Sequence, residues 1–244
     1  MDAPIIELLN VSKTYSTAAG DFPALRDINL TVHKGEFLGV VGKSGAGKST
    51  LLNMINGVDE LTTGETLVHS NGRRVSVHHL TENEKALWRG KTMGVVYQSF
   101  QLLPMLTLVE NITLPMDLAG AFKPRESRQR AFELLRLVEI EEHADKLPAL
   151  VSGGQQQRVA IARALANDPE IIVADEPTGS LDSVTADHIF DVFSRLASER
   201  GKTIVMVTHD MGLKNRFTRC LTLVDGELQP ETGADSKPKR SRRK

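Results

Sequence analysis

The stretch GVVGKSGAGKST, residues 39–50, constrains the fold more than any other part of the chain. An apolar, strand-like run precedes it and residues with helical spacing follow it, and it matches the pattern G-x-x-x-x-G-K-[ST]. Glycines let successive backbone N–H groups point inward at phosphate oxygens, and the start of the helix adds the positive end of its dipole. The sequence therefore predicts a phosphate-binding loop between a strand and a helix.

Individual residues of this loop have separate predicted roles. We expect Lys48 to lie against the β- and γ-phosphates of a nucleotide, and Ser49 to bind Mg²⁺ through its hydroxyl. Lys43 adds positive charge beside the phosphates. The predicted nucleotide-binding residues of the loop are Gly42, Lys43, Ser44, Gly45, Ala46, Gly47, Lys48, Ser49 and Thr50.

A pair of carboxylates at the end of another apolar run complements the loop. In IIVADEP, residues 171–177, four apolar residues lead to Asp175 and Glu176. Ligands of open α/β sheets bind at the carboxyl ends of the strands, where such a pair would lie. We expect Asp175 to bind Mg²⁺ through water and Glu176 to act as the base for an attacking water. Taken alone, the pair could equally be two solvated carboxylates.

The pattern of elements predicts an α/β fold. Strand-like runs and helical segments alternate in the second half of the chain, which indicates a mainly parallel sheet covered on both faces. Helical character dominates residues 107–145, where apolar residues 131, 132, 134, 135, 138 and 140 share one face. Strands are expected at 5–11, 24–32, 36–42, 170–175, 202–208 and 219–226, a hairpin at 64–70 and 73–79 with its turn at Asn71-Gly72, and helices at 48–57, 81–90, 153–167 and 183–200.

One further motif points to a family. VSGGQQQRVAIARAL, residues 151–165, resembles the signature of the ATP-binding cassette (ABC) family, usually written LSGGQ, with Val151 in place of Leu. Ser152 and Gln155 form a capping box that would start a helix in any protein. A capped helix start with two glycines also presents free N–H groups to a phosphate. The resemblance implies that Ser152, Gly153, Gly154 and Gln155 bind ATP held by another subunit, with Ser152 and Gly154 on its γ-phosphate.

The resemblance extends over nearly the whole chain and implies further site residues. Tyr15 would stack on adenine, although it could also be an ordinary tyrosine of a surface strand. Gln98 would reach Mg²⁺ and water, Asp182 in GSLD would lie at the subunit contact, and His209 would contact the γ-phosphate. The implied catalytic residues are Lys48, Gln98, Glu176 and His209, and the implied metal-binding residues are Ser49, Gln98 and Asp175.

The resemblance also implies an architecture and a partner copy. We expect one domain over residues 1–235: a P-loop nucleotidase core with an N-terminal antiparallel β subdomain and a helical subdomain inserted at about 99–157. Each chain has one phosphate loop and one signature, so two chains would pair head-to-tail, enclosing two equivalent ATP sites.

The biological task is less constrained by the sequence. FQLLPMLTLVENITLPM, residues 100–116, and the triple glutamine are most similar to the lipoprotein-releasing and macrolide-exporter type of cassette. That type implies a separate membrane-spanning permease, bound in a groove lined by Phe100, Leu102, Leu103 and Leu106, although these side chains could simply be core. The alternative is a cell-division or signalling cassette acting through a membrane protein without transport. No nucleic-acid partner is expected.

Charge and cysteine content bear on location. Cys220 is the only cysteine, which fits a reducing compartment, and no uncharged apolar run approaches eighteen residues. We therefore expect a cytoplasmic protein, peripheral on the inner face of the cell membrane. The last nine residues, 236–244, hold six basic side chains, so with a total of −1 the rest of the chain carries −7. This tail is expected to be a disordered extension, or alternatively to bind anionic headgroups.

Overall fold

The computed structural model describes residues 4–18, 20–70 and 72–229. The basic tail at 236–244 and Asn71 of the expected hairpin turn lie outside these residues. Within them, no helix combines the length and the apolar character needed to cross a membrane.

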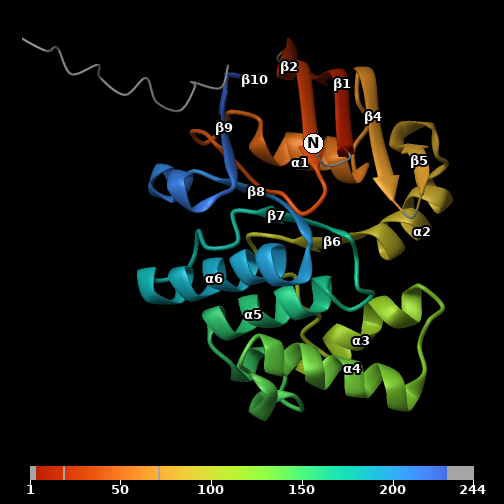
Figure 1. The fold of residues 1–244 in the computed structure, drawn as a ribbon, viewed down its shortest axis with the longest axis vertical. Helices are drawn as coiled ribbons and strands as arrows, with labels where there is room; N and C mark the ends of the chain where they lie inside the picture. The colour runs from red at the N-terminus through yellow and green to blue at the C-terminus, as the bar shows by residue number, and fades with distance from the viewer. Residues whose placement is uncertain (1–3, 19, 71, 230–244) are drawn as a thin grey trace, which may run out of the picture.

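A six-stranded sheet forms the centre of the molecule (Figure 1). Its strand order is β10-β9-β3-β8-β7-β6, and all neighbouring pairs are parallel except β10 with β9. The strands are β3 Phe37–Val41, β6 Met93–Val96, β7 Ile171–Asp175, β8 Thr203–Thr208, β9 Arg219–Val224 and β10 Glu227–Leu228. The mainly parallel sheet expected from the sequence is confirmed.

An antiparallel sheet in the order β2-β1-β4-β5 is formed by the N-terminal part of the chain. Its strands are β1 Pro4–Thr17, β2 Gly20–His33, β4 Thr63–Ser70 and β5 Arg73–Ser76. The strand expected at 73–79 is too long, because Val77–His79 form a 3₁₀ turn. Val77 is fully buried and the His78 ring lies 3.0 Å from the Met54 carbonyl, and these contacts lead the chain away from the sheet.

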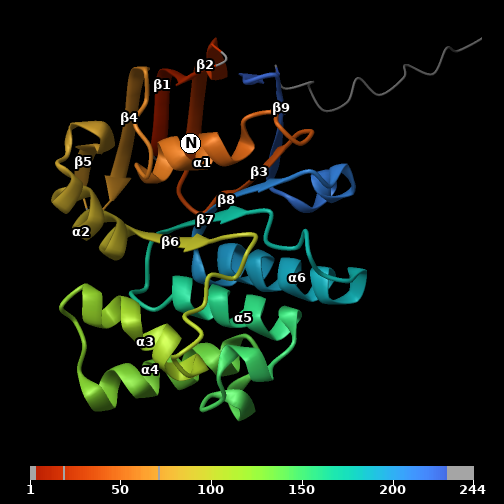
Figure 2. The same ribbon diagram turned by 180° about the vertical axis from the view of Figure 1, so that it is seen from behind.

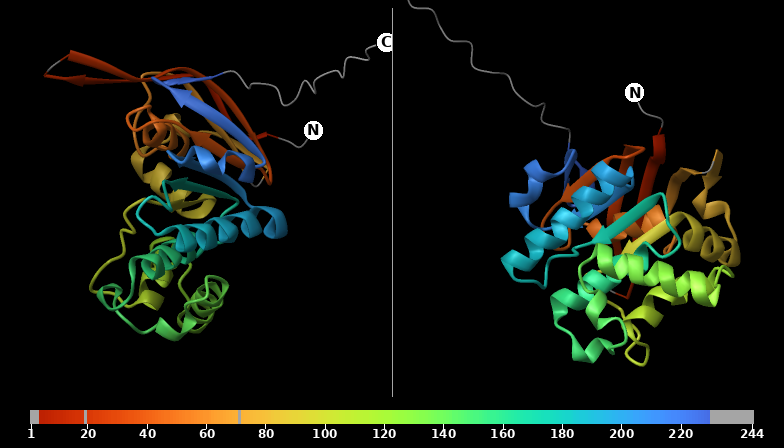
Figure 3. Two further views of the ribbon diagram at one scale, coloured as in Figure 1. Left: turned by 90° about the vertical axis from the view of Figure 1, so that its left-hand side faces the viewer. Right: turned by 60° about the horizontal axis from the view of Figure 1, so that its bottom comes forward.

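Helices cover both faces of the central sheet (Figures 1 and 2). Helix α1 lies on the side of the antiparallel sheet, and α5 and α6 lie on the opposite side. Figure 3 shows α3 and α4 beyond α5, away from the sheet. The helices are α1 Lys48–Asn56, α2 Glu82–Thr92, α3 Leu108–Leu118, α4 Pro124–Leu137, α5 Gly153–Ala164 and α6 Ser183–Arg200. The boundaries of an inserted helical subdomain at about 99–157 stay a prediction.

Alternating side chains of the parallel strands supply two separate apolar cores. In β8, Ile204 and Met206 join the core beneath α5 and α6, whereas Val205 and Val207 join the core beneath α1. Successive strand residues point to opposite faces, so a strand buried on both sides must be apolar throughout. This two-sided burial fixes the carboxyl ends of the strands, where the loops that follow β3, β7 and β8 begin.

Two helix ends differ from the expected positions. Helix α5 ends at Ala164 rather than near residue 167, and the Asn167 amide beyond it donates to the carbonyls of Gly90 and Pro115. Helix α4 ends at Leu137, yet Val138 and Ile140 remain buried on the predicted apolar face. In both places, tertiary contacts outweigh the helical periodicity of the sequence.

Candidate active site

The loop between β3 and α1 is a tight turn in which two glycines take left-handed conformations. Gly47 has φ +101° as it caps α1, and Gly45 has φ +81°. A Cβ atom on Gly42 would lie 2.4 Å from the Leu223 carbonyl oxygen, so only glycine fits there. Lys48 folds back over the loop and donates to the carbonyls of Gly42 and Lys43 at 3.0 Å each. The curled strand–loop–helix geometry expected of a phosphate loop is present.

Glu176 contacts the side chains of Lys48 and His209 beside this loop. Its Oε1 atom lies 3.2 Å from Lys48 Nζ, and its Oε2 atom lies 2.8 Å from His209 Nδ1. Burial alone would raise the pKa of Glu176, but the hydrogen bonds from His209 and Lys48 and their charges outweigh it, so the pKa lies below its usual value. The carboxylate is therefore ionised near neutral pH.

Asp175, at the end of β7, has the opposite pKa shift. Burial raises its pKa and the neighbouring Glu176 charge raises it further, against a hydrogen bond from Ser49 and the attraction of Lys48. Ser49 and Asp175 thus present hard oxygen ligands side by side. Within the described residues, no three His, Cys, Asp or Glu side chains gather in a metal site of their own. One carboxylate and one hydroxyl suit a Mg²⁺ ion that takes its other ligands from phosphates and water.

A cavity of about 430 Å³ joins these residues. Tyr15, Gln98 and Glu176 line it together with loop residues, including Ser44, Gly45, Gly47, Lys48, Ser49 and Thr50. The Gln98 amide nitrogen and a Glu176 carboxylate oxygen lie 3.3 and 3.5 Å from where a Gly179 Cβ would be. The structure therefore brings the predicted loop, Tyr15, Gln98 and Glu176 to one place. Lys43 and Ala46 line a neighbouring cavity with His209.

The signature residues form a second, separate group. Ser152 caps α5 with the predicted capping box: its hydroxyl accepts from Gln155 N–H and its N–H donates to Gln155 Oε1. Asp182 caps α6 by accepting from Thr185 N–H and Oγ1. A Cβ atom on Gly154 would lie 2.6 Å from Thr185 Cγ2, so the two helix starts are adjacent. Ser152, Gly153, Gly154, Gln155 and Asp182 are all absent from the described residues that line the phosphate-loop cavity.

The loop at residues 100–106, which carries the side chains predicted to bind the permease, is held by two side chains that no sequence motif points to. The buried Asn111 amide donates to the carbonyls of Leu103, Leu106 and Thr107, and accepts from Leu103 N–H. Arg163 donates to the carbonyls of Phe100 and Gln101. Leu103 of this loop is 40% exposed to solvent. Asn111 follows an ordinary capping box at Thr107 and Glu110, and only the fold shows that it faces this loop.

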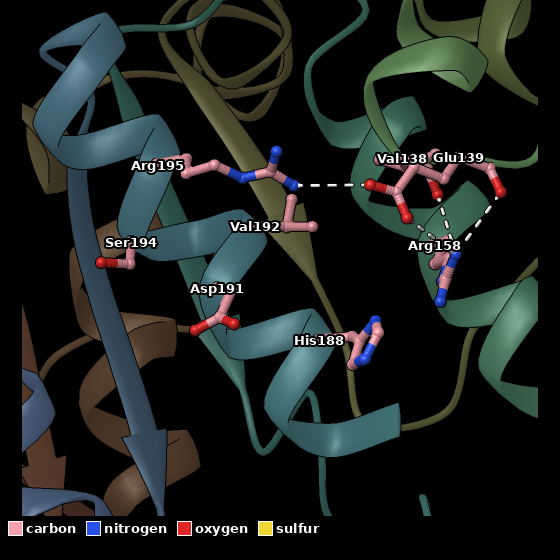
Figure 4. A pocket seen from close by; sticks show the side chains of 8 residues that line it. All are labelled: Val138, Glu139, Arg158, His188, Asp191, Val192, Ser194 and Arg195. Carbon is pink, nitrogen blue, oxygen red and sulfur yellow. Dashed lines mark hydrogen bonds and ion pairs between the residues drawn. The ribbon is translucent and has the colours of Figure 1, made fainter. Parts of the chain in front are cut away.

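A further cavity of about 390 Å³ lies between α6, α5 and the chain after α4 (Figure 4). Glu139 lies 3.7 Å from Arg158 and 4.0 Å from Arg195 across it, and His188 also points into this space. Asp191 also lines this cavity, so two carboxylates and two guanidinium groups face it. None of the predicted site residues lines this cavity.

Comparison with known proteins identifies the family. The sequence profile described as "ABC transporter" matches residues 25–179. The chain belongs to the ABC transporter family. As a cassette of this family it is an ATPase, and ATP is its nucleotide. The resemblance drawn from the signature motif is confirmed.

Several characterised and uncharacterised cassettes align over almost the whole chain. The uncharacterized ABC transporter ATP-binding protein MJ0796 of Methanocaldococcus jannaschii is 44% identical over 230 residues, which is 93% of this chain and 96% of that protein. The lipoprotein-releasing system ATP-binding protein LolD of Francisella tularensis is 41% identical, covering 94% and 97%. The macrolide export ATP-binding/permease protein MacB of Syntrophobacter fumaroxidans is 43% identical over 94% of this ABC cassette, which spans only 32% of MacB.

Solved structures share the fold. The dimeric structure of the MJ0796 cassette superposes with a TM-score of 0.85 at 43% identity, covering 93% of this chain and 97% of that one. A dimeric post-hydrolysis state of MJ0796 bound to ADP and Pi gives a TM-score of 0.84 at 42% identity, with the same coverage. The α/β class expected from the sequence, with its antiparallel N-terminal sheet, is thereby confirmed.

Proposed function

We propose that two copies of this chain enclose ATP at two shared sites and that their closure drives a separate membrane-spanning partner. The observation that carries the proposal is the division of the site residues into two groups within one chain. The phosphate-loop cavity holds Lys48 and Glu176, whereas the signature at the start of α5 is absent from its lining. A head-to-tail pair would supply each cavity with the signature of the other chain. The dimeric structures of the similar MJ0796 cassette support this arrangement.

Individual residues have distinct proposed roles in hydrolysis. Backbone N–H groups of residues 42–50 and the Lys48 ammonium bind the phosphates, and the Tyr15 ring binds the adenine. Glu176 accepts a proton from the attacking water, while His209 holds the carboxylate through its Nδ1 contact of 2.8 Å and contacts the γ-phosphate. Catalysis of phosphoryl transfer depends mainly on such positioning and on charge stabilisation.

Mg²⁺ fits the oxygen ligands at the end of β7. Ser49, Asp175 and the Gln98 amide would hold the ion, and it would neutralise charge that develops on the phosphates. The raised pKa of Asp175 supports this role, because a carboxylate that is destabilised by burial gains most from a bound cation.

The partner and the location are inferred from the relatives' names and from one surface. The similar LolD belongs to a lipoprotein-releasing system, and MacB carries a permease in the same protein. We place this cassette on the inner face of the cell membrane, bound to a permease through Phe100, Leu102, Leu103 and Leu106. Leu103 and the neighbouring Met105 are exposed, and the buried Asn111 fixes their loop, so the loop offers a rigid apolar contact.

The Glu176→Gln variant tests the paired site. It keeps the size of the side chain but removes the base, so ATP should bind and turnover should fall by roughly 10²–10⁴-fold. Gel filtration should show a monomer without nucleotide and a dimer with ATP and Mg²⁺. A monomer in both conditions, with the membrane partner also present, would contradict the shared site.

The Leu103→Asp variant tests the partner surface. It should retain ATP binding and lose co-purification with the spanning subunit, since a carboxylate would be buried against an apolar partner. Leu9→Asp is the matched control, because Leu9 has a similar exposure, 39%, on β1 of the antiparallel sheet. Unchanged co-purification of Leu103→Asp would refute the surface. The periplasmic part of the captured subunit would distinguish transport from signalling.

A further inference from the structure

A cluster of charged and aromatic side chains lies at the edge of the phosphate-loop cavity. We propose that Asp59 and Lys13 are positioning residues that fix the Tyr15 ring so that a nucleobase can stack on one defined face of it. This inference rests on the proposed binding of adenine by Tyr15. It adds two residues outside every motif of the sequence, and it gives them a role in base affinity rather than in the chemical step.

The hydrogen bonds of the cluster leave the Tyr15 ring little freedom. The Tyr15 hydroxyl donates to Asp59 Oδ2 at 2.6 Å, and Lys13 Nζ donates to Asp59 Oδ1 at 3.0 Å. Both carboxylate oxygens are thus used, one for the ring and one for the ammonium. Lys13 also donates to the Glu60 carbonyl, and Thr50 in the first turn of α1 hydrogen-bonds the Tyr15 oxygen. The ring is tied to both ends of the phosphate-loop helix.

Lys13 also defines which face of the ring is free. Its ammonium lies 4.6 Å from the centroid of the Tyr15 ring, a cation–π contact that occupies one face. Lys13 is only 9% exposed, so this ammonium is held in place by its surroundings. Tyr15 nevertheless lines the nucleotide cavity. A base that enters the cavity would therefore meet the face opposite Lys13.

The hairpin that carries Tyr15 needs such a fixation. Pairing between β1 and β4 ends at Ser12 and Thr63, and the register places Tyr15 opposite Phe22 of β2. Figure 3 shows the end of this β1–β2 hairpin extending beyond the rest of the sheet. The loop after α1 compensates for the missing strand contacts: Asp59 binds Lys13 and Tyr15, and Thr62 Oγ1 accepts from Thr14 N–H.

Protonation states agree with this geometry. Burial raises the pKa of Tyr15 and the Asp59 carboxylate raises it further, so the hydroxyl keeps its proton and can donate. Burial alone would raise the pKa of Asp59, but the hydrogen bonds from Tyr15 and Lys13 outweigh it and lower the pKa. Near neutral pH the Tyr15 hydroxyl is thus a neutral donor and the Asp59 carboxylate an ionised acceptor.

Asp59→Ala and Tyr15→Phe, made singly and together, test the proposal in the full chain. Each single variant should raise KM for ATP at least roughly tenfold, as expected when the hydrogen bond from Tyr15 to the charged Asp59 acceptor is lost, with kcat nearly unchanged. The double variant should cost clearly less than the sum of the two single variants, because both remove the bond between Tyr15 and Asp59. Affinity for inorganic tripolyphosphate, which has no base, should stay at the wild-type value in calorimetry. Asp21→Ala is the control, because Asp21 lies on the same hairpin and, within the described part of the chain, its carboxylate accepts from Ser16 and not from Tyr15 or Lys13.

The outcomes separate this inference from the proposed function. A wild-type chain that neither binds nor hydrolyses ATP would refute the proposed function itself. Wild-type ATP binding together with an unchanged KM in Asp59→Ala would refute only the positioning role. So would a parallel loss of tripolyphosphate affinity, which would indicate general damage to the loop. Should Asp59→Ala unfold, Asp59→Asn keeps the volume but loses the charge and one of the two acceptor oxygens, so it must still raise KM for ATP while tripolyphosphate affinity stays at the wild-type value.

Discussion

Substitution of Gly47 by alanine should separate backbone strain from steric overlap in the phosphate loop. Gly47 has φ +101°, and a Cβ atom there would lie 2.4 Å from the Ala24 carbonyl oxygen and 3.1 Å from Leu25 Cδ2. Ala24 belongs to β2, whose register with β1 fixes its backbone. Gly45 is the matched control, since its φ of +81° is also left-handed but nothing lies within 4 Å of its Cβ position.

The two variants differ in the costs they incur. A left-handed conformation costs a non-glycine residue about 1–2 kcal/mol, and this is the whole cost for Gly45→Ala. Gly47→Ala adds overlap with a backbone atom, about another 1–3 kcal/mol for an overpacked site. In a domain of this size 1 kcal/mol lowers Tm by about 2–4 °C. We therefore expect Tm to fall by about 2–8 °C for Gly45→Ala and by about 4–20 °C for Gly47→Ala.

Thermal and urea unfolding without nucleotide measure this difference, and ATP titration measures its effect on the site. Gly47 precedes Lys48, so relief of the overlap must move the lysine, and ATP affinity should fall further in Gly47→Ala than the loss of stability alone explains. Equal unfolding midpoints for the two alanine variants would refute the reasoning, because they would show that β2 yields to the new methyl group.

Three further substitutions test other parts of the structure. Asp175→Asn should raise Tm at neutral pH while abolishing Mg²⁺-dependent turnover. The raised pKa of Asp175 means that its ionised form destabilises the fold, and this penalty appears as the pH rises from below the unfolded pKa through the folded pKa. The gain in Tm should therefore vanish in acid. His209→Ala should move the acid limb of the pH–kcat profile to higher pH, because Glu176 loses a hydrogen bond that lowers its pKa. Phe190→Ala should cost about 3–5 kcal/mol in urea unfolding, because the buried ring packs against Phe37 and Phe217 with centroids 5.2 Å away in each case.

Local signals in the sequence were reliable where the structure depends on neighbouring residues. The capping boxes at Thr81 and Ser152 start α2 and α5 as expected, and Gly57 ends α1 in the left-handed conformation. The local alternation does not predict the 3₁₀ turn at Val77–His79, where His78 contacts the Met54 carbonyl, more than twenty positions earlier in the chain. Alternation of apolar residues specifies a strand only while a partner strand lies alongside it.

The candidate site shows the same division between local and distant information. Motifs located the phosphate loop, the carboxylate pair and the signature, because each is a short segment with its own geometry. Asp59 and Lys13 have no motif, and their contacts with Tyr15 and with each other combine positions up to 46 residues apart. The local sequence pattern also does not say whether the signature faces the phosphate loop of its own chain or that of a second copy. In the fold, the signature residues are absent from the lining of the phosphate-loop cavity.

A strained backbone conformation occurs at the strand end that carries the proposed base. Glu176, directly after β7, has φ +44°, a left-handed conformation that costs a non-glycine residue about 1–3 kcal/mol. A hydrogen bond of 3.0 Å from Glu176 N–H to the Val207 carbonyl holds the strained residue against β8. Strand β8 is itself buried in an apolar core on each face, so it does not yield to this strain. The two apolar cores thus stabilise the turn that points Glu176 at Lys48 and His209. A substitution that opens a cavity beneath β8 should disturb the position of Glu176 before it unfolds the domain.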